Sequence, residues 1–304
     1  SIFLREVRYL EKELLYKSAE KSLANKDYFK AAEELSKLYV EYGEKNFRIN
    51  YLLFISFKNL NEHERAVETA EECLENYIRD NCKFSQYLSE KILSGGMIQA
   101  LQLKKQLEPY MKEPEQKYFS QEISEAFEKF LEGNEKTFQK VNKRFAHCGS
   151  LDVHEQSDAV KEACCLDENS YVKSAKRACS DEYLHPMICG SILSELKKLG
   201  YSEKIQCFCP LLNEVCDVIP SKLCEIDESV LYMSMKKRLE EDLTIPFDLK
   251  ARYLDEIKIK LMMIWPQMQE FNETSGEVLY SEFIGKRVSK RSEWFEKQLK
   301  VLEK

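Results

Sequence analysis

The sequence predicts an all-α protein in which antiparallel helical hairpins stack side by side. Glycine and proline, which interrupt helices, number only 9 and 7 among 304 residues. Charged residues make up 33% of the chain, and apolar residues recur among them at the spacing of one helix face. A short pattern also returns about every 34 residues, which is typical of repeated helix-turn-helix units.

The repeated pattern is a turn-forming residue, then a helix start, then a small residue one turn later. Its copies begin at Lys26, Asn61 and Gly95. Their small residues are Ala31, Ala66 and Ala100, which follow one another at 35 and 34 positions (66 − 31 and 100 − 66). Two helices approach closely only where a side chain is small, so we expect these alanines at helix interfaces.

The first hairpin begins at the N-terminus. Residues 1–25 are expected to form one long helix or two in tandem, whose latter part pairs with a helix over 28–42. The carboxylate of Asp27 is expected to cap this second helix, and Gly43 to end it.

Two further hairpins follow. A helix over 47–60 is expected to pair with one that Asn61 caps, and Glu64 then completes a variant of the capping box. In the third hairpin, Gly95 and Gly96 form the turn between the two helices.

Residues 12–112 resemble three tetratricopeptide repeats, a family of helical hairpins that build superhelical scaffolds. The resemblance rests on the period and on the small residue of each second helix. At the first-helix signature the sequence departs from the family, because only the first copy has the expected small residue, Ala19. The resemblance implies a right-handed superhelical stack over residues 1–148, with a C-terminal helical domain over 149–304 that continues it.

The C-terminal half is expected to remain helical. A degenerate fourth hairpin is placed around Gly133. Beyond it we expect helices over 152–166, 168–180, 186–199, 202–218 and 221–241, another that Pro246 opens, a loop over 272–276, and a final helix from about Ser292.

In the family that the chain resembles, the first helices line a concave surface that binds a peptide or a helix of another protein. Matching positions imply a groove lined by Tyr16, Glu20, Arg48, Tyr51, Ile55, Lys58, Asn59, Ser85, Ser89 and Ile92. This mixture of side chains suits a peptide with aromatic and acidic residues.

A second candidate site is basic. Residues 151–285 hold 15 basic and 25 acidic residues, whereas residues 286–304 hold seven basic and three acidic ones. Lys286, Arg287, Lys290 and Arg291 could bind phosphate or an acidic partner there, although a solvated helix face or linker explains them as well. The acidic body disfavours broad nucleic-acid binding.

Nine of the eleven cysteines fall between Cys148 and Cys224. Cys207, Cys209, Cys216 and Cys224, with Cys189 and His185 upstream, could supply ligands for zinc, but their spacing lacks the paired Cys-x2-Cys motifs of zinc sites. We therefore interpret them as reduced core thiols and expect no metal or cofactor.

The sequence shows no glycine-rich phosphate loop, no apolar run long enough for a membrane span and no signal peptide. We expect an intracellular, cytoplasmic protein without enzymatic activity. The leading hypothesis is a scaffold or adaptor that binds another protein within a larger complex. The alternative is a factor associated with nucleic acid or ribonucleoprotein through the basic segment.

Overall fold

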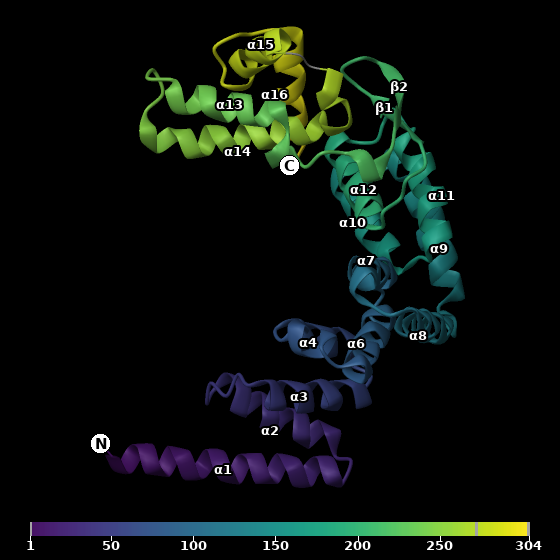
Figure 1. Cartoon of the computed structure of the whole chain (residues 1–304), viewed down its shortest axis with the longest axis vertical. Helices are drawn as coiled ribbons and strands as arrows, with labels where there is room; N and C mark the ends of the chain where they lie inside the picture. Colours follow the sequence, from purple (N-terminus) through teal and green to yellow (C-terminus); the bar gives the residue numbers. More distant parts are fainter. Residues whose placement is uncertain (1, 271–272, 303–304) are drawn as a thin grey trace. The chain divides into compact units, whose positions relative to one another are not determined.

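Figure 1 shows the computed structural model of the chain, which describes residues 2–270 and 273–302. The chain divides into two compact units, Ser1–Glu135 (unit 1) and Lys136–Lys304 (unit 2). The described residues form sixteen α-helices and one two-stranded antiparallel sheet, so the predicted all-α class is confirmed at this level. Within the described ranges, no helix is both long enough and apolar enough to cross a membrane.

In unit 1, consecutive helices pack against one another. The main pairs are α1 with α2, α2 with α3, α3 with α4, α4 with α6, and α6 with α8. The helices are α1 (Ile2–Ala24), α2 (Tyr28–Val40), α3 (Phe47–Asn59), α4 (His63–Glu71), α5 (Leu74–Ile78), α6 (Asn81–Leu93), α7 (Met97–Leu107) and α8 (Glu113–Leu131). Residues 2–24 thus form one continuous helix and not two helices in tandem.

The core of unit 1 is one continuous cluster of apolar side chains from Ala19 to Ala126. Ala31, Ala66 and Ala100 all lie in it and are at most 1% exposed, as their spacing predicts. Tyr77 is fully buried, and its ring contacts the ring of Phe54 edge-on at 5.3 Å between centroids. Small and aromatic side chains therefore both contribute to the close packing between the helices.

The turns of unit 1 confirm one predicted helix cap and correct another. The Asp27 carboxylate accepts a hydrogen bond from the Lys30 backbone N–H at 3.2 Å, as expected for an N-cap. Asn61 does not cap α4. Its φ is +57°, and the residue before the helix is Glu62, which forms no side-chain cap hydrogen bond. Asparagine tolerates left-handed backbone, so Asn61 forms the turn instead.

Unit 2 combines helices with the sheet. Its elements are α9 (Glu135–Ala146), α10 (Val153–Glu162), α11 (Glu168–Cys179), α12 (Pro186–Lys198), β1 (Ile205–Cys209), β2 (Glu214–Val218), α13 (Val230–Glu241), α14 (Phe247–Met263), α15 (Glu273–Phe283) and α16 (Lys290–Leu302). The helices predicted over 168–180 and 186–199 are confirmed as α11 and α12, and Pro246 directly precedes α14 as expected.

The helix predicted over 202–218 is wrong, because these residues form the β1–β2 hairpin (Figure 1). Ile205, Cys207 and Cys209 are buried while Gln206 between them is exposed. This alternation has the period of two that a strand requires. The chain reverses at Asn213, which has a φ of +53°.

Two further predictions in unit 2 are corrected. The helix predicted over 221–241 begins only at Val230, where the Ser229 hydroxyl accepts a hydrogen bond from the Tyr232 N–H at 3.2 Å. The loop predicted over 272–276 is the start of α15, at least from Glu273; residue 272 lies outside the described residues. Gly276 is buried there, and a Cβ on it would lie 3.1 Å from Leu231 Cδ1, so glycine permits close packing of α15 on α13.

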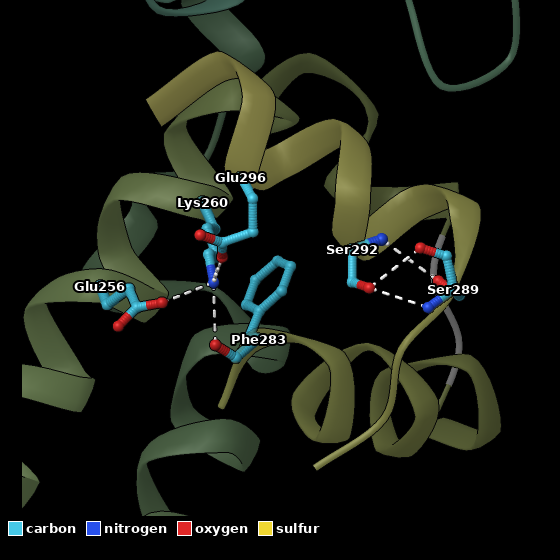
Figure 2. Close-up of polar contacts among 6 residues, drawn as sticks. All are labelled: Glu256, Lys260, Phe283, Ser289, Ser292 and Glu296. Atoms are coloured by element: carbon cyan, nitrogen blue, oxygen red, sulfur yellow. Dashed lines mark hydrogen bonds and ion pairs between the residues drawn. The ribbon is translucent and has the colours of Figure 1, made fainter. Parts of the chain in front are cut away.

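A buried lysine joins the last three helices of unit 2 (Figure 2). Lys260 of α14 is 1% exposed, and its ammonium donates to Glu256 at 2.6 Å, to the Phe283 carbonyl at 2.9 Å and to Glu296 at 2.9 Å. Ser289 and Ser292 exchange backbone and side-chain hydrogen bonds at the start of α16. Polar contacts thus fix both the N-terminal turn of α16 and its packing on α14.

Candidate functional site

The residues expected to line a groove lie on α1, α3 and α6, and several of them bridge one of these helices to the next. Arg48 of α3 donates to Glu20 of α1 at 2.9 Å, and its guanidinium lies 5.1 Å from the centre of the Tyr16 ring. These three side chains therefore form one polar contact between α1 and α3.

The next contact joins α3 to α6. The Tyr51 hydroxyl donates to the Gln86 side chain at 3.0 Å, and the Lys83 ammonium lies 5.2 Å from the centre of the Tyr51 ring. Ile55 is half-buried and packs against the core. Ile92, expected on the same surface, is instead fully buried in the core.

The third contact joins α6 to α8. Ser85 is 3% exposed and donates to Glu122 at 2.5 Å. Side-chain contacts thus connect α1, α3, α6 and α8 in turn, through pairs separated by 28, 35 and 37 positions. We call this set of four connected helices the first-helix layer.

Four of the predicted groove residues line one cavity of about 470 Å³ on this layer, which we call the α3–α6–α8 pocket. The members from the predicted set are Lys58, Asn59, Ser85 and Ser89. The other residues of its lining are Asn61, His63, Gln86, Glu90, Leu93, Glu122, Glu125, Ala126 and Lys129. Tyr16, Glu20, Arg48, Tyr51 and Ile55 do not line it.

All three acids that line the α3–α6–α8 pocket have hydrogen-bond partners within unit 1. Glu90 is 2% exposed, and its carboxylate lies 2.6 Å from His63 Nδ1. Glu122 accepts from Ser85, and Glu125 accepts from Gln121 at 2.8 Å. The ammonium groups of Lys58 and Lys129 form no ion pair with any described residue. The pocket therefore offers two ammonium groups without an ion pair, next to three carboxylates that are hydrogen-bonded within unit 1.

Sequence reasoning missed the contribution of α8 to the pocket. The turn expected at Gly133 is present, because Gly133 has a φ of +84° and lies between α8 and α9. The sequence did not reveal that α8, from Glu113 to Leu131, packs on α6. A signal was present in the sequence, because Phe119, Ile123 and Ala126 repeat at helical spacing, and all three are buried.

The basic segment is partly neutralised within its own unit. Lys286 donates to Asp242 at 2.5 Å, and Arg291 to Glu282 at 2.6 Å. The Lys286 ammonium and the Thr244 hydroxyl hold the pKa of the Asp242 carboxyl well below its usual range. Two of the four predicted cations, Lys286 and Arg291, are thus committed to intramolecular ion pairs.

The cysteines are all free thiols. Cys207 lies opposite Cys216 in the β1–β2 hairpin, but among the described residues the four cysteines from Cys207 to Cys224 do not form a group that could hold a metal ion. Cys207 and Cys209 are buried, Cys216 is half-buried and Cys224 is exposed. Cys207 instead meets Cys179 and Cys189. His185 accepts at Nδ1 from the Met187 N–H at 3.2 Å and so caps α12.

A further cavity of about 600 Å³ lies in unit 2, beside α12 and α14. Most of its charged groups pair with residues of the same unit: Lys258 lies 2.8 Å from Asp227, and Glu225 pairs with Lys197. These pairs hold the short turns between β2 and α13 against the helices, which is a structural role.

Comparison of the chain with protein-family models, with curated proteins and with solved structures finds no match.

Proposed function

We propose that unit 1 is a stack of helical hairpins similar to tetratricopeptide repeats, and that it binds another protein on the first-helix layer. The protein would act as a non-enzymatic scaffold or adaptor in a larger complex. The single observation that carries this proposal is the α3–α6–α8 pocket, which three successive members of one helix layer build. The burial of Ala31, Ala66 and Ala100 supports the repeat assignment.

The pocket suits a peptide or helix that presents a carboxylate. Lys58 and Lys129 supply positive charge at the lining, and Asn59 and Ser89 supply groups that hydrogen-bond a peptide backbone. Asn59 donates one Nδ2–H to the Ile55 carbonyl at 2.8 Å, and its Oδ1 is an acceptor that a peptide N–H can use. Because the helices hold these groups before the partner arrives, little ordering entropy opposes binding.

The test is affinity purification of the full chain from native cells, with mass spectrometry of the co-eluting proteins at low and at high salt. The variant Lys58→Glu/Lys129→Glu reverses the charge of both lysines that line the pocket. Its matched control is Lys30→Glu/Lys37→Glu, which makes the same change at exposed positions of α2. We expect the pocket variant alone to lose partners, by roughly tenfold or more.

Equal recovery of the same proteins by both variants would show that the pocket is not the binding site. The nucleic-acid alternative gives a different pattern. Bound nucleic acid would wash off with salt and would be lost when Lys286, Arg287, Lys290 and Arg291 are neutralised. No contact in the described ranges favours that alternative, since Lys286 and Arg291 are already paired.

A further inference from the structure

Unit 2 brings three cysteines from distant parts of the sequence into contact. Cys179 ends α11, Cys189 lies in the first turns of α12, and Cys207 lies at the middle of β1. Their Sγ atoms all lie within 4.8 Å of one another, and the residues are 1%, 7% and 0% exposed, respectively. Because α11 packs on both α12 and β1, the fold itself holds the thiols together.

The separation of the sulfur atoms fits a tetrahedral metal ion. A Zn–S bond of about 2.3 Å places the sulfurs of a tetrahedral site roughly 3.8 Å apart. Thiols within 4.8 Å of one another need to close by only about 1 Å to reach that spacing, which small rotations of the cysteine side chains supply. Soft thiolate ligands select zinc over magnesium or calcium.

One of the three thiols also lies near the N-terminal end of a helix. Cys189 lies near the start of α12, and its N–H bonds the His185 carbonyl at 3.0 Å. The N-terminal end of a helix carries partial positive charge, which stabilises a nearby thiolate.

A small cavity adjoins two of the three thiols and has a polar wall. Its volume is about 10 Å³, and its lining includes Cys179, Cys189, Asp181 and Gln267. Gln267 is 4% exposed. Its Nε2 donates to Cys209 Sγ at 2.8 Å, whereas its Oε1 has no hydrogen-bond partner among the described residues. This volume accommodates about one water molecule, and it is too small for an iron–sulfur cluster or an organic substrate.

We propose that the thiolates of Cys179, Cys189 and Cys207 bind one Zn²⁺ ion, with a water molecule in the fourth coordination position beside Gln267. The three thiols give up their protons to solvent as the ion binds. A metal-bound water donates to Gln267 Oε1, which satisfies this buried acceptor. The ion ties α11, α12 and β1 together, which is a structural role that is independent of the pocket in unit 1.

The test measures metal in the purified full chain, prepared without a histidine tag and under reducing conditions. Elemental analysis by mass spectrometry is expected to find about one zinc ion per chain. Cys189→Ser and Cys207→Ser are each expected to reduce this content to about a tenth or less. The matched control is Cys165→Ser, which changes a buried thiol outside the cluster and should keep the wild-type content.

Replacement of zinc by Co²⁺ gives a second measurement. The wild-type chain and Cys165→Ser should show the charge-transfer and visible absorption of tetrahedral cobalt thiolate, and Cys207→Ser should not. The proposal is overturned if a Cys207→Ser chain that is folded by circular dichroism holds as much zinc as the wild type. It is also overturned if the wild-type chain holds no metal after incubation with Zn²⁺ and Co²⁺. The discovery of a disulfide between two of the three cysteines in that metal-free chain would then explain the cluster.

Discussion

Single polar residues inside both units determine how their helices meet. In unit 1, Asn50 is fully buried. Its side chain donates to the Thr69 carbonyl at 2.6 Å and accepts from the Tyr77 hydroxyl at 2.9 Å. Burial raises the pKa of Tyr77 well above its ordinary value, so its hydroxyl stays protonated and remains a donor. One asparagine thereby satisfies buried groups on α4 and α5.

In unit 2, Lys260 is the buried polar residue that contacts groups on neighbouring helices. An ammonium at 1% exposure is unfavourable unless acceptors surround it, and here two carboxylates and a carbonyl do so. The side chains of Glu256 and Glu296 are themselves 30% and 54% exposed, so solvent screens part of the attraction. The stem of the lysine lies against Phe283, with the ammonium 5.8 Å from the ring centre.

We therefore predict that Lys260→Ala lowers the free energy of unfolding by roughly 2–4 kcal/mol, because it removes a buried stem and leaves the Phe283 carbonyl unpaired. Lys260→Met keeps the stem and should cost less, which separates packing from charge. The control Lys237→Ala, at an exposed position of α13, should change stability by less than about 0.5 kcal/mol. Urea denaturation measures all three, and equal stability of Lys260→Ala and the control would contradict the prediction.

At the scale of elements, helices with a clear apolar face could be predicted, and short elements could not. The 3.6-residue period located α2, α3, α11 and α12 to within a few residues. The hairpin of β1 and β2 was missed because each strand has only five residues, and apolar residues are dense enough there to match either period. The decisive feature is the left-handed turn at Asn213, which a helix cannot contain.

This turn leads to a prediction about the hairpin. Asn213 has a φ of +53°, and its N–H bonds the Cys209 carbonyl at 2.8 Å. Asn213→Val should destabilise the protein by about 1–2 kcal/mol, since a β-branched residue resists left-handed backbone. Asn213→Gly should be nearly neutral. The control is Leu212→Val, because Leu212 is an exposed neighbour without a positive φ. Equal free energies of unfolding for Leu212→Val and Asn213→Val would contradict the prediction.

At the scale of the whole molecule, most of the successful predictions depend on the period of about 34 residues. It located the helices that build the first-helix layer, and Lys58, Asn59, Ser85 and Ser89 meet at one pocket as a result. The pocket wall that α8 supplies could not be placed, because this helix follows α6 at a longer interval. The meeting of Cys179 with Cys207 depends on tertiary packing alone, since 28 positions separate them in sequence.

The closed core of unit 1 leads to a final prediction, that residues 1–135 fold on their own. The core cluster from Ala19 to Ala126 lies wholly within this range, so the fragment should be helical by circular dichroism and should unfold cooperatively in urea.

A fragment of residues 1–107 is the matched comparison, because it lacks α8. Without that helix, Phe84 loses its edge-on contact with the Phe119 ring at 5.0 Å between centroids, and the Ser85 hydroxyl loses Glu122. We expect the free energy of unfolding of the shorter fragment to be lower than that of the 1–135 fragment by about 3 kcal/mol or more, as for the deletion of one large core side chain. A non-cooperative 1–135 fragment, or equal stability of the two fragments, would mean that α8 and the core of unit 1 do not form one cooperative unit.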